Sequence, residues 1–273
     1  MTTNATNVLN NRLTYLDPES RHFNLCWQAT LFMLSLFIVT LILWSFDQRQ
    51  LDNVSVWAKP LKFESSLTIY FITLALLATY LPVATRMRAT WRWAVRFAVA
   101  AGVFEMVYIL IQAARGRASH YNNDTNVEEL MYAAMGIGAV LLVAVSFYLG
   151  WLLYREYRKD KNDIFKLAAA HGMMWGSVLT LVTAGAMSSG QTHFAGTPAI
   201  DSMRVPIVGW ILSGGDLRIP HFFATHLMQV LPVYGLFLQR RKIRLDVAKK
   251  NVRYFLLVYC SLVLTGFSVC FLF

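Results

Sequence analysis

The sequence is poor in charged residues, and this shortage excludes several classes of protein. Charged residues make up 15% of the 273 positions and hydrophobic residues 56%, whereas about a quarter of a soluble domain is charged. The mean hydropathy is +0.45. A chain stays disordered only when it has too few apolar residues to bury a core. The composition therefore excludes a disordered protein and a soluble or secreted enzyme.

Cysteine is also scarce, with only Cys26, Cys260 and Cys270 and no C-x-x-C pair. Such a small, odd number gives no disulfide framework. All three fall in long apolar stretches, where a free cysteine packs as a small hydrophobic side chain. A disulfide-rich scaffold is thus excluded, and we assign these cysteines no chemistry.

The sequence does contain seven apolar stretches, each close to the roughly 20 residues that a helix needs to cross a membrane. They run over Cys26–Phe46, Phe63–Val83, Trp93–Gln112, Leu130–Leu153, Ile164–Met187, Pro220–Leu238 and Val252–Phe273. The first is too long for a signal peptide and is interpreted as a retained anchor. The sequence predicts an all-α, polytopic transmembrane bundle over residues 26–273, preceded by an N-terminal segment of residues 1–25.

Most of the basic residues lie in the N-terminal segment and in every second connection between spans. These 18 of the 25 Lys and Arg residues are Arg12, Arg21, Arg86, Arg88, Arg92, Arg96, Arg155, Arg158, Lys159, Lys161, Lys166, Arg240, Arg241, Lys242, Arg244, Lys249, Lys250 and Arg253. Cytoplasmic connections carry such an excess. We therefore predict a multi-pass protein of the bacterial inner membrane, with its N-terminus inside and its C-terminus outside. The net charge of +10 indicates a lipid bilayer as the partner, with no nucleic acid.

The three outer connections are nearly neutral and hold most of the unusual residues. In the first, Lys59 precedes Pro60, and proline suits the first turn of a helix. The second span should therefore begin near Pro60 and carry Glu64 close to its start. Lys59 alone is typical of a lysine that extends to the lipid headgroups. Glu64 is a candidate catalytic residue.

The third span carries Glu105, Tyr108 and Gln112, whose spacing places them on one face of a helix. An ionisable residue inside a membrane is costly unless it is paired or protonated, and it usually marks a functional site. Glu105 is therefore a second candidate catalytic residue. A structural hydrogen bond between helices is the alternative, and for Tyr108 it is the favoured one.

The second outer connection is rich in hydrogen-bond donors. It contains Arg115, Arg117 and His120 within six residues, and guanidinium groups suit the binding of carboxylate or phosphate. We expect the two arginines to bind an anionic lipid or cofactor, and His120 is a candidate metal ligand. An ordinary solvated loop is the alternative.

The third outer connection is long, from Ser188 to Ile219, and includes an apolar patch over Val205–Leu212. Eight residues cannot cross a membrane, so the patch is predicted to be re-entrant or interfacial. Asp216 and Arg218 follow it as candidate cofactor-binding residues. The Asp216 carboxylate is expected to accept hydrogen bonds from nearby backbone N–H groups.

The sixth span begins with His221 and continues through His226. Two histidines five residues apart lie about 140° apart on a helix, so they do not form the four-residue pair that chelates zinc in many proteases. Each is still a candidate metal ligand, and His226 is also a candidate catalytic residue. Because His226 and Glu105 lie at similar depths, roughly 10 Å from the outer ends of their spans, we expect one outward-facing cavity to contain both.

Three blocks carry a resemblance to known sequences: Trp57–Phe63 (WAKPLKF), Arg115–Asn122 (RGRASHYN) and Gly215–Phe222 (GDLRIPHF), the last continuing to His226. They resemble a family of uncharacterised bacterial polytopic membrane proteins over most of the chain from Val56 to Pro232. The resemblance implies a membrane protein and names no activity.

Three known classes fit poorly: the last span has no interior lysine for a rhodopsin-type Schiff base, the phosphatidic-acid phosphatase motifs are absent, and no H-x-x-x-H pair matches the ceramidase-like hydrolases. The pattern favours a membrane enzyme that depends on a transition metal or another cofactor and acts on an anionic or lipidic substrate. A redox protein with haem b bound through histidines is one alternative. A transporter or receptor with a polar pocket is another, and the few polar residues of the inner half weigh against it.

Overall fold

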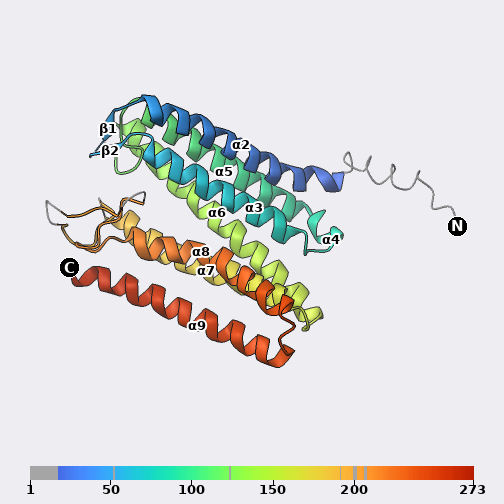
Figure 1. Ribbon diagram of the computed structural model, residues 1–273. Coiled ribbons are helices and arrows are strands. Elements are labelled where there is room, and N and C mark those ends of the chain that lie inside the picture. Colours follow the sequence, from blue (N-terminus) through green and yellow to red (C-terminus); the bar gives the residue numbers. More distant parts are fainter. Residues whose placement is uncertain (1–17, 52, 123, 191, 199–201, 206–207) are drawn as a thin grey trace. The chain divides into compact units, whose positions relative to one another are not determined.

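The computed structural model describes residues 18–273 except residues 52, 123, 191, 199–201 and 206–207 (Figure 1). Within this part, seven helices are long and apolar enough to cross a membrane. They are α2 (Pro18–Phe46), α3 (Ala58–Ala78), α5 (Ala89–Ala114), α6 (Asn126–Lys159), α7 (Ile164–Ser189), α8 (Arg218–Arg240) and α9 (Leu245–Val269). The predicted all-α fold of seven spans is confirmed, and the chain is a multi-pass membrane protein.

Four short elements complete the description. The connection between α2 and α3 forms an antiparallel hairpin of β1 (Gln50–Leu51) and β2 (Val54–Ser55). A single helical turn, α4 (Val83–Arg86), precedes α5, and the 3-10 helix η2 (Cys270–Leu272) follows α9. In the described residues, β-strands are thus confined to one hairpin, and each of its two strands has two residues.

Most helices begin a few residues before the apolar stretch. Among the described residues, helices α3, α5, α8 and α9 begin without a side-chain cap, whereas α7 has one. The Asp163 carboxylate accepts a hydrogen bond from the Lys166 backbone N–H at 2.9 Å and caps α7. Helix α6 is longer than the predicted span because acidic residues in its first turn and basic residues in its last turn suit the helix dipole. The apolar stretches of the sequence therefore predict the membrane-spanning part of each helix better than they predict where the helix begins and ends.

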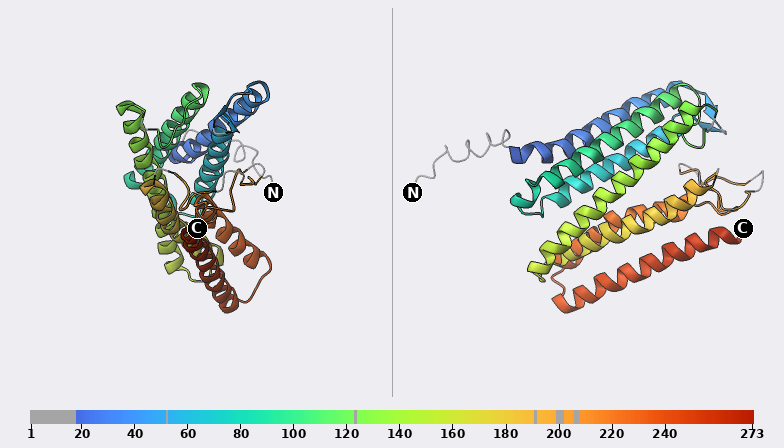
Figure 2. Two further views of the ribbon diagram at one scale, coloured as in Figure 1. Left: turned by 90° about the vertical axis from the view of Figure 1, so that its left-hand side faces the viewer. Right: turned by 180° about the vertical axis from the view of Figure 1, so that it is seen from behind.

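The chain divides into two compact units, and the boundary falls inside α6. Unit 1, Met1–Leu142, contains α2, α3, α5 and the first half of α6. Its helices lie alongside one another, with α3 packed against both α2 and α5 (Figures 1 and 2). The close approach of α3 and α5 depends on Gly102, where an added Cβ would meet the Phe71 ring at 3.0 Å.

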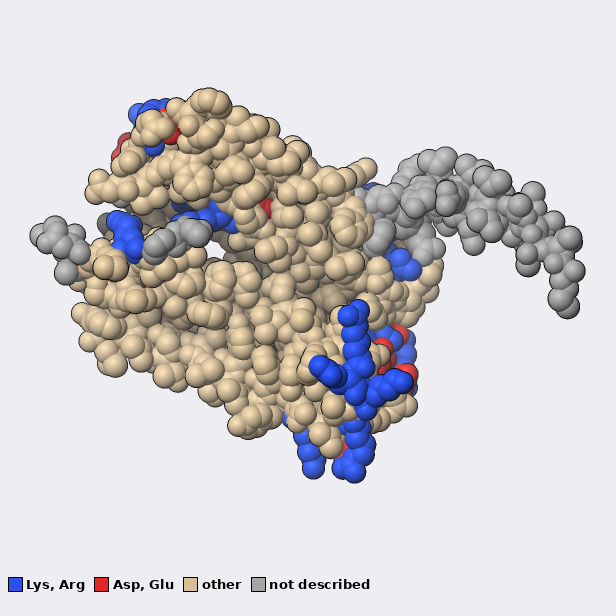
Figure 3. All heavy atoms as spheres, in the orientation of Figure 1, with Lys and Arg blue, Asp and Glu red and all other residues tan. Residues whose placement is uncertain are grey.

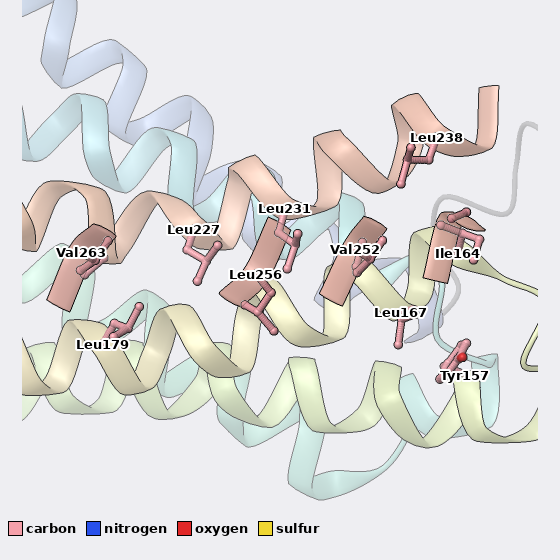
Figure 4. Close-up of a cluster of buried hydrophobic side chains, with 13 residues drawn as sticks. Tyr157, Ile164, Leu167, Leu179, Leu227, Leu231, Leu238, Val252, Leu256 and Val263 are labelled. Atoms are coloured by element: carbon pink, nitrogen blue, oxygen red, sulfur yellow. The ribbon is translucent and has the colours of Figure 1, made fainter. Parts of the chain in front are cut away.

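Unit 2, Val143–Phe273, contains the second half of α6 together with α7, α8 and α9. A cluster of buried side chains from all four helices forms its core (Figure 4). Helix α7 contacts α8 through Gly172 and Gly176, where an added Cβ would meet α8 atoms at 3.0 Å and 2.7 Å. Small residues on α7 thus allow the two helices to approach closely.

Most basic residues of unit 2 lie near the ends of α6 and α8 and the beginnings of α7 and α9. Figure 3 shows Lys and Arg side chains where α8 turns into α9. Ion pairs at the neighbouring helix ends join Lys159 to Glu156 and Lys166 to Asp163. Such a charged end is typical of the membrane face that the positive-inside rule places in the cytoplasm. The orientation itself stays a prediction.

Candidate functional site

The hairpin between α2 and α3 is held by one carboxylate. Asp47 accepts hydrogen bonds from the Arg49 guanidinium, the shortest at 2.6 Å, and from the Trp57 indole N–H at 2.8 Å. The bonds from Arg49 hold the pKa of the Asp47 carboxyl well below its usual range. Arg49 also donates to the carbonyl of Ala114, the last residue of α5, at 2.9 Å. These contacts tie α2, α3 and α5 together at what we call the hairpin end of unit 1.

Below this end, a lysine lies near two other ionisable side chains from different segments. Lys59 comes from the first turn of α3, Glu105 from the middle of α5, and His120 from the loop that follows α5. The charges of Lys59 and Glu105 attract each other, and the Lys59 charge also acts on His120. Glu105 is 5% exposed. The structure therefore gathers two candidate residues and one lysine within a single unit.

His120 is held among aromatic rings. Its ring lies 5.7 Å from the Phe63 ring and 5.6 Å from the Tyr132 ring, centre to centre. Burial, reinforced by the nearby Lys59 charge, lowers the pKa of His120 to about 3. The Ser119 hydroxyl lies 3.3 Å from Nδ1. His120 is therefore a neutral imidazole at physiological pH, which is the form that ligates metals and exchanges hydrogen bonds in both directions.

Two arginines at the hairpin end share a single carboxylate. Glu128, in the first turn of α6, is 4% exposed. Its Oε1 lies 3.1 Å from Arg117 Nη1 and 3.8 Å from Arg115 Nη1. The two guanidinium side chains are 46% and 49% exposed, respectively. The two guanidinium groups thus share one carboxylate and keep part of their surface open to an anion.

A chain of hydrogen bonds leads from this surface into unit 1. Arg115 Nη1 donates to Gln112 Oε1 at 3.1 Å, and Gln112 Nε2 donates to the Tyr108 hydroxyl at 2.7 Å. Glu105, Tyr108 and Gln112 are all buried on the same side of α5, which confirms their predicted common face. The loop beside the arginines has a hollow of about 260 Å³ whose lining includes Arg117 and Tyr121.

Glu64 is separate from this network. It is 0% exposed, and its Oε1 accepts a hydrogen bond from the Thr40 hydroxyl of α2 at 2.7 Å. In the described structure its other oxygen, Oε2, is buried and has no hydrogen-bond partner.

In unit 2, Asp216 and Arg218 bind each other. Arg218 Nη2 lies 2.6 Å from Asp216 Oδ2 and also donates to the Gly209 carbonyl at 2.9 Å. Asp216 accepts from the backbone N–H groups of Ile211 and Arg218 at 3.0 Å and 3.1 Å, as predicted for its carboxylate. These bonds fold the long connection onto the start of α8. We expected these two residues to bind a cofactor. In the structure they hold the long connection against the start of α8.

The predicted re-entrant segment, Val205–Leu212, includes residues 206 and 207, which lie outside the described residues. Of its other residues, Val208 and Leu212 lie in turns, and an isolated bridge joins Ile211 to Arg204. The Trp210 ring packs edge-on against Phe222 of α8 at 5.3 Å between ring centres. The described part of the segment thus contacts α8 near its start.

The two histidines of α8 have different surroundings. His221 Nδ1 lies 2.9 Å from the hydroxyl of Thr183, which is on α7. His226 Nδ1 lies 2.7 Å from the Phe222 carbonyl, and the two rings stack with centres 4.0 Å apart. Both contacts use Nδ1, so Nε2 is the atom of each ring that is available to a metal. His171, near the start of α7, packs on the Tyr154 ring.

Glu105 and His120 belong to unit 1, whereas His221 and His226 belong to unit 2. Their predicted meeting in one cavity therefore stays a prediction. Within the residues that the structure describes, no group of three or more His, Cys, Asp or Glu side chains could hold a metal ion. The transition metal and the haem b likewise stay predictions.

Sequence reasoning missed Glu128 and Thr40. Glu128 follows Thr125 by three residues, and the Thr125 hydroxyl accepts from the Glu128 backbone N–H at 3.3 Å while donating to its Oε2 at 3.1 Å. This resembles a capping box, whose T-x-x-E pattern was visible in the sequence. No local pattern marks Thr40, because its role depends on a partner 24 residues away.

No protein-family model, curated protein or solved structure matches this chain. The resemblance of the three sequence blocks to a bacterial membrane protein family therefore stays a prediction.

Proposed function

We propose that this chain is a membrane enzyme of the bacterial inner membrane that binds an anionic, lipid-derived substrate at the hairpin end of unit 1. The observation that carries the proposal is the shared carboxylate: Arg115 and Arg117 are half exposed, and in the ion pairs of the described residues both contact Glu128. A phosphate or carboxylate headgroup would supply the missing negative charge. Its acyl chains would remain in the bilayer beside the helices.

The groups for proton transfer lie below the arginines. Lys59, Glu105 and His120 differ in charge and are brought close by α3, α5 and the loop after α5. Acid–base catalysis needs such groups within reach of one bound substrate. Arg115 connects to their helix through Gln112 and Tyr108. In this proposal the arginines bind the substrate, while Glu105 and Lys59 exchange protons with it.

The test uses the full chain in nanodiscs of phosphatidylcholine, with short-chain phosphatidic acid as the anionic probe. We expect the probe to raise the thermal midpoint of the wild type, and short-chain phosphatidylcholine to leave it unchanged. Arg115→Gln should lose most of this shift. It is preferred to an Arg117 variant because Arg117 makes the shorter contact with Glu128.

Catalysis is measured separately from binding, by mass spectrometry of the incubated probe and of extracted bacterial lipids. The Glu105→Gln variant should bind the probe as the wild type does but should no longer convert the probe or any extracted lipid into a product. Binding without conversion of any anionic lipid would contradict the enzyme and favour a receptor. Equal shifts with the anionic and the zwitterionic probe would contradict the anion site itself.

A bound transition metal or haem b is a second proposal, supported by the available Nε2 atoms of His221 and His226. An amide is a much weaker ligand than an imidazole. Metal analysis and a visible spectrum of the purified protein should show a cofactor that His221→Gln and His226→Gln lose. His171→Gln is the matched control and should retain it. If all three variants keep the metal and haem content of the wild type, this proposal is contradicted.

A further inference from the structure

The Glu64 carboxyl is buried between α2 and α3 at the level of the apolar part of both helices. Thr40 and Glu64 each lie about 9 Å along their helices from the hairpin that connects them, at 1.5 Å per residue. Both side chains are almost completely buried, at 1% and 0% exposed. The single hydrogen bond between them is 2.7 Å long. Neither water nor lipid headgroups can therefore solvate this carboxyl from outside.

No ion pair among the described residues includes the Glu64 carboxyl, so a negative charge on it would not be neutralised. Helix α2 carries no Asp, Glu, Lys, Arg or His from Leu25 to Phe46. On α3 the charge of Lys59 acts on Glu105, which α5 carries. Among the described residues, the Thr40 hydroxyl donates to Glu64 Oε1, and Oε2 is buried without a hydrogen-bond partner. This distinguishes Glu64 from Glu105, which has a lysine nearby.

An unpaired carboxylate in this position would cost several kcal/mol, because its charge would have neither solvent nor partner. A neutral carboxylic acid avoids most of that cost. Oε1 already accepts the Thr40 hydrogen bond, so the proton belongs on Oε2, the atom without a partner. The geometry therefore favours an O–H on Oε2 and a C=O that accepts from Thr40.

We infer that Glu64 and Thr40 form a proton-binding site that is occupied at neutral pH. Its ligand is the proton, and the site stands apart from the proposed substrate site because it rests on different contacts. Loss of this proton would leave a charge between α2 and α3, the two helices of unit 1 that pack against each other most extensively. Occupancy of the site thus controls how well these two helices pack.

Infrared difference spectroscopy of the full chain in lipid tests this inference directly. At pH 7 the wild type minus Glu64→Gln spectrum should contain the C=O stretching band of a protonated carboxylic acid. Thr40→Val should keep that band and shift it to higher frequency, because the C=O loses its hydrogen bond. Glu105→Gln is the matched control and should leave the band unchanged.

A loss of carboxylate bands in place of the acid band would overturn the inference, since it would mean that Glu64 is ionised. If Glu64→Gln does not fold, the wild type and Thr40→Val labelled with ¹³C-glutamate replace it. The acid band must then shift on labelling and differ between these two proteins. An acid band that is the same in both would also overturn the inference. Neither outcome depends on whether anionic lipid binds at Arg115.

Discussion

His120 shows how the surroundings of a single residue control its charge. Its pKa is lowered to about 3 by burial and by the Lys59 charge, whereas an unfolded histidine titrates near 6.5. Above pH 6.5 both states are neutral and His120 adds no pH dependence. Below pH 6.5 the unfolded chain binds a proton that the folded chain does not. Stability should therefore fall with decreasing pH, by at most about 1.4 kcal/mol per pH unit down to pH 3.

We expect His120→Gln to reduce this acid sensitivity. The difference in unfolding midpoint between pH 7.5 and pH 5.0 should be smaller in the variant than in the wild type. The measurement is thermal unfolding in detergent or nanodiscs at both pH values, so that each protein serves as its own reference. An equal difference in the two proteins would show that His120 is protonated as easily in the folded chain as in the unfolded one.

The residue types of the site could be predicted from the sequence, but their pairing could not. The depth of Glu105 and its common face with Gln112 follow from helical periodicity, and the backbone contacts of Asp216 follow from turn chemistry. The attraction between Lys59 and Glu105 joins α3 to α5, and the hydrogen bond between Thr40 and Glu64 joins α2 to α3. Such contacts depend on how helices pack, which no local sequence pattern encodes.

At the scale of helices, α7 and α8 approach closely because Gly172 has no side chain. A Cβ there would meet the Leu227 carbonyl oxygen, Pro232 Cδ and Leu231 Cβ at 3.0, 3.0 and 3.1 Å. These atoms belong to or adjoin the α8 backbone and cannot move without the helix. Gly172→Ala should destabilise the protein by about 1–3 kcal/mol, as overpacking usually does.

Gly185 lies on the same helix and provides the control, because no described atom lies within 4 Å of the position that a Cβ would take there. Gly185→Ala should leave stability unchanged or raise it by up to about 1 kcal/mol, since alanine is the better helix former. Thermal or denaturant unfolding of both variants measures the difference. Equal effects would mean that the α7–α8 contact does not depend on the missing side chain of Gly172.

Helix α6 begins with a contact that also organises the arginine cluster. Thr125 binds both the backbone N–H and the carboxylate of Glu128. Thr125→Val should cost roughly 0.5–2 kcal/mol of stability through loss of the helix cap. The control is Thr73→Val, because the Thr73 hydroxyl donates to the Ile69 carbonyl within the interior of α3 and caps no helix. Unfolding of both variants measures the difference, and comparable losses would argue against a capping role.

At the scale of the whole chain, length and hydropathy were sufficient to predict the number and approximate positions of the spans. They could not predict the division into two units inside α6, since that helix is continuous in sequence and in structure. The predicted single cavity combined residues of both units from their depth alone. Depth restricts where two residues lie along the membrane normal but says nothing about their separation within the plane of the membrane.

The orientation of the chain is the prediction on which an outward-facing site depends. The N-terminal segment and alternate connections hold 18 of the 25 basic residues, and such connections remain in the cytoplasm. Alkaline phosphatase, which is active only in the periplasm, should be inactive when fused after Lys161 and active when fused after Gly190, one span later. The reverse pattern would place Arg115 and Arg117 in the cytoplasm. The anionic substrate would then have to come from the inner leaflet of the membrane.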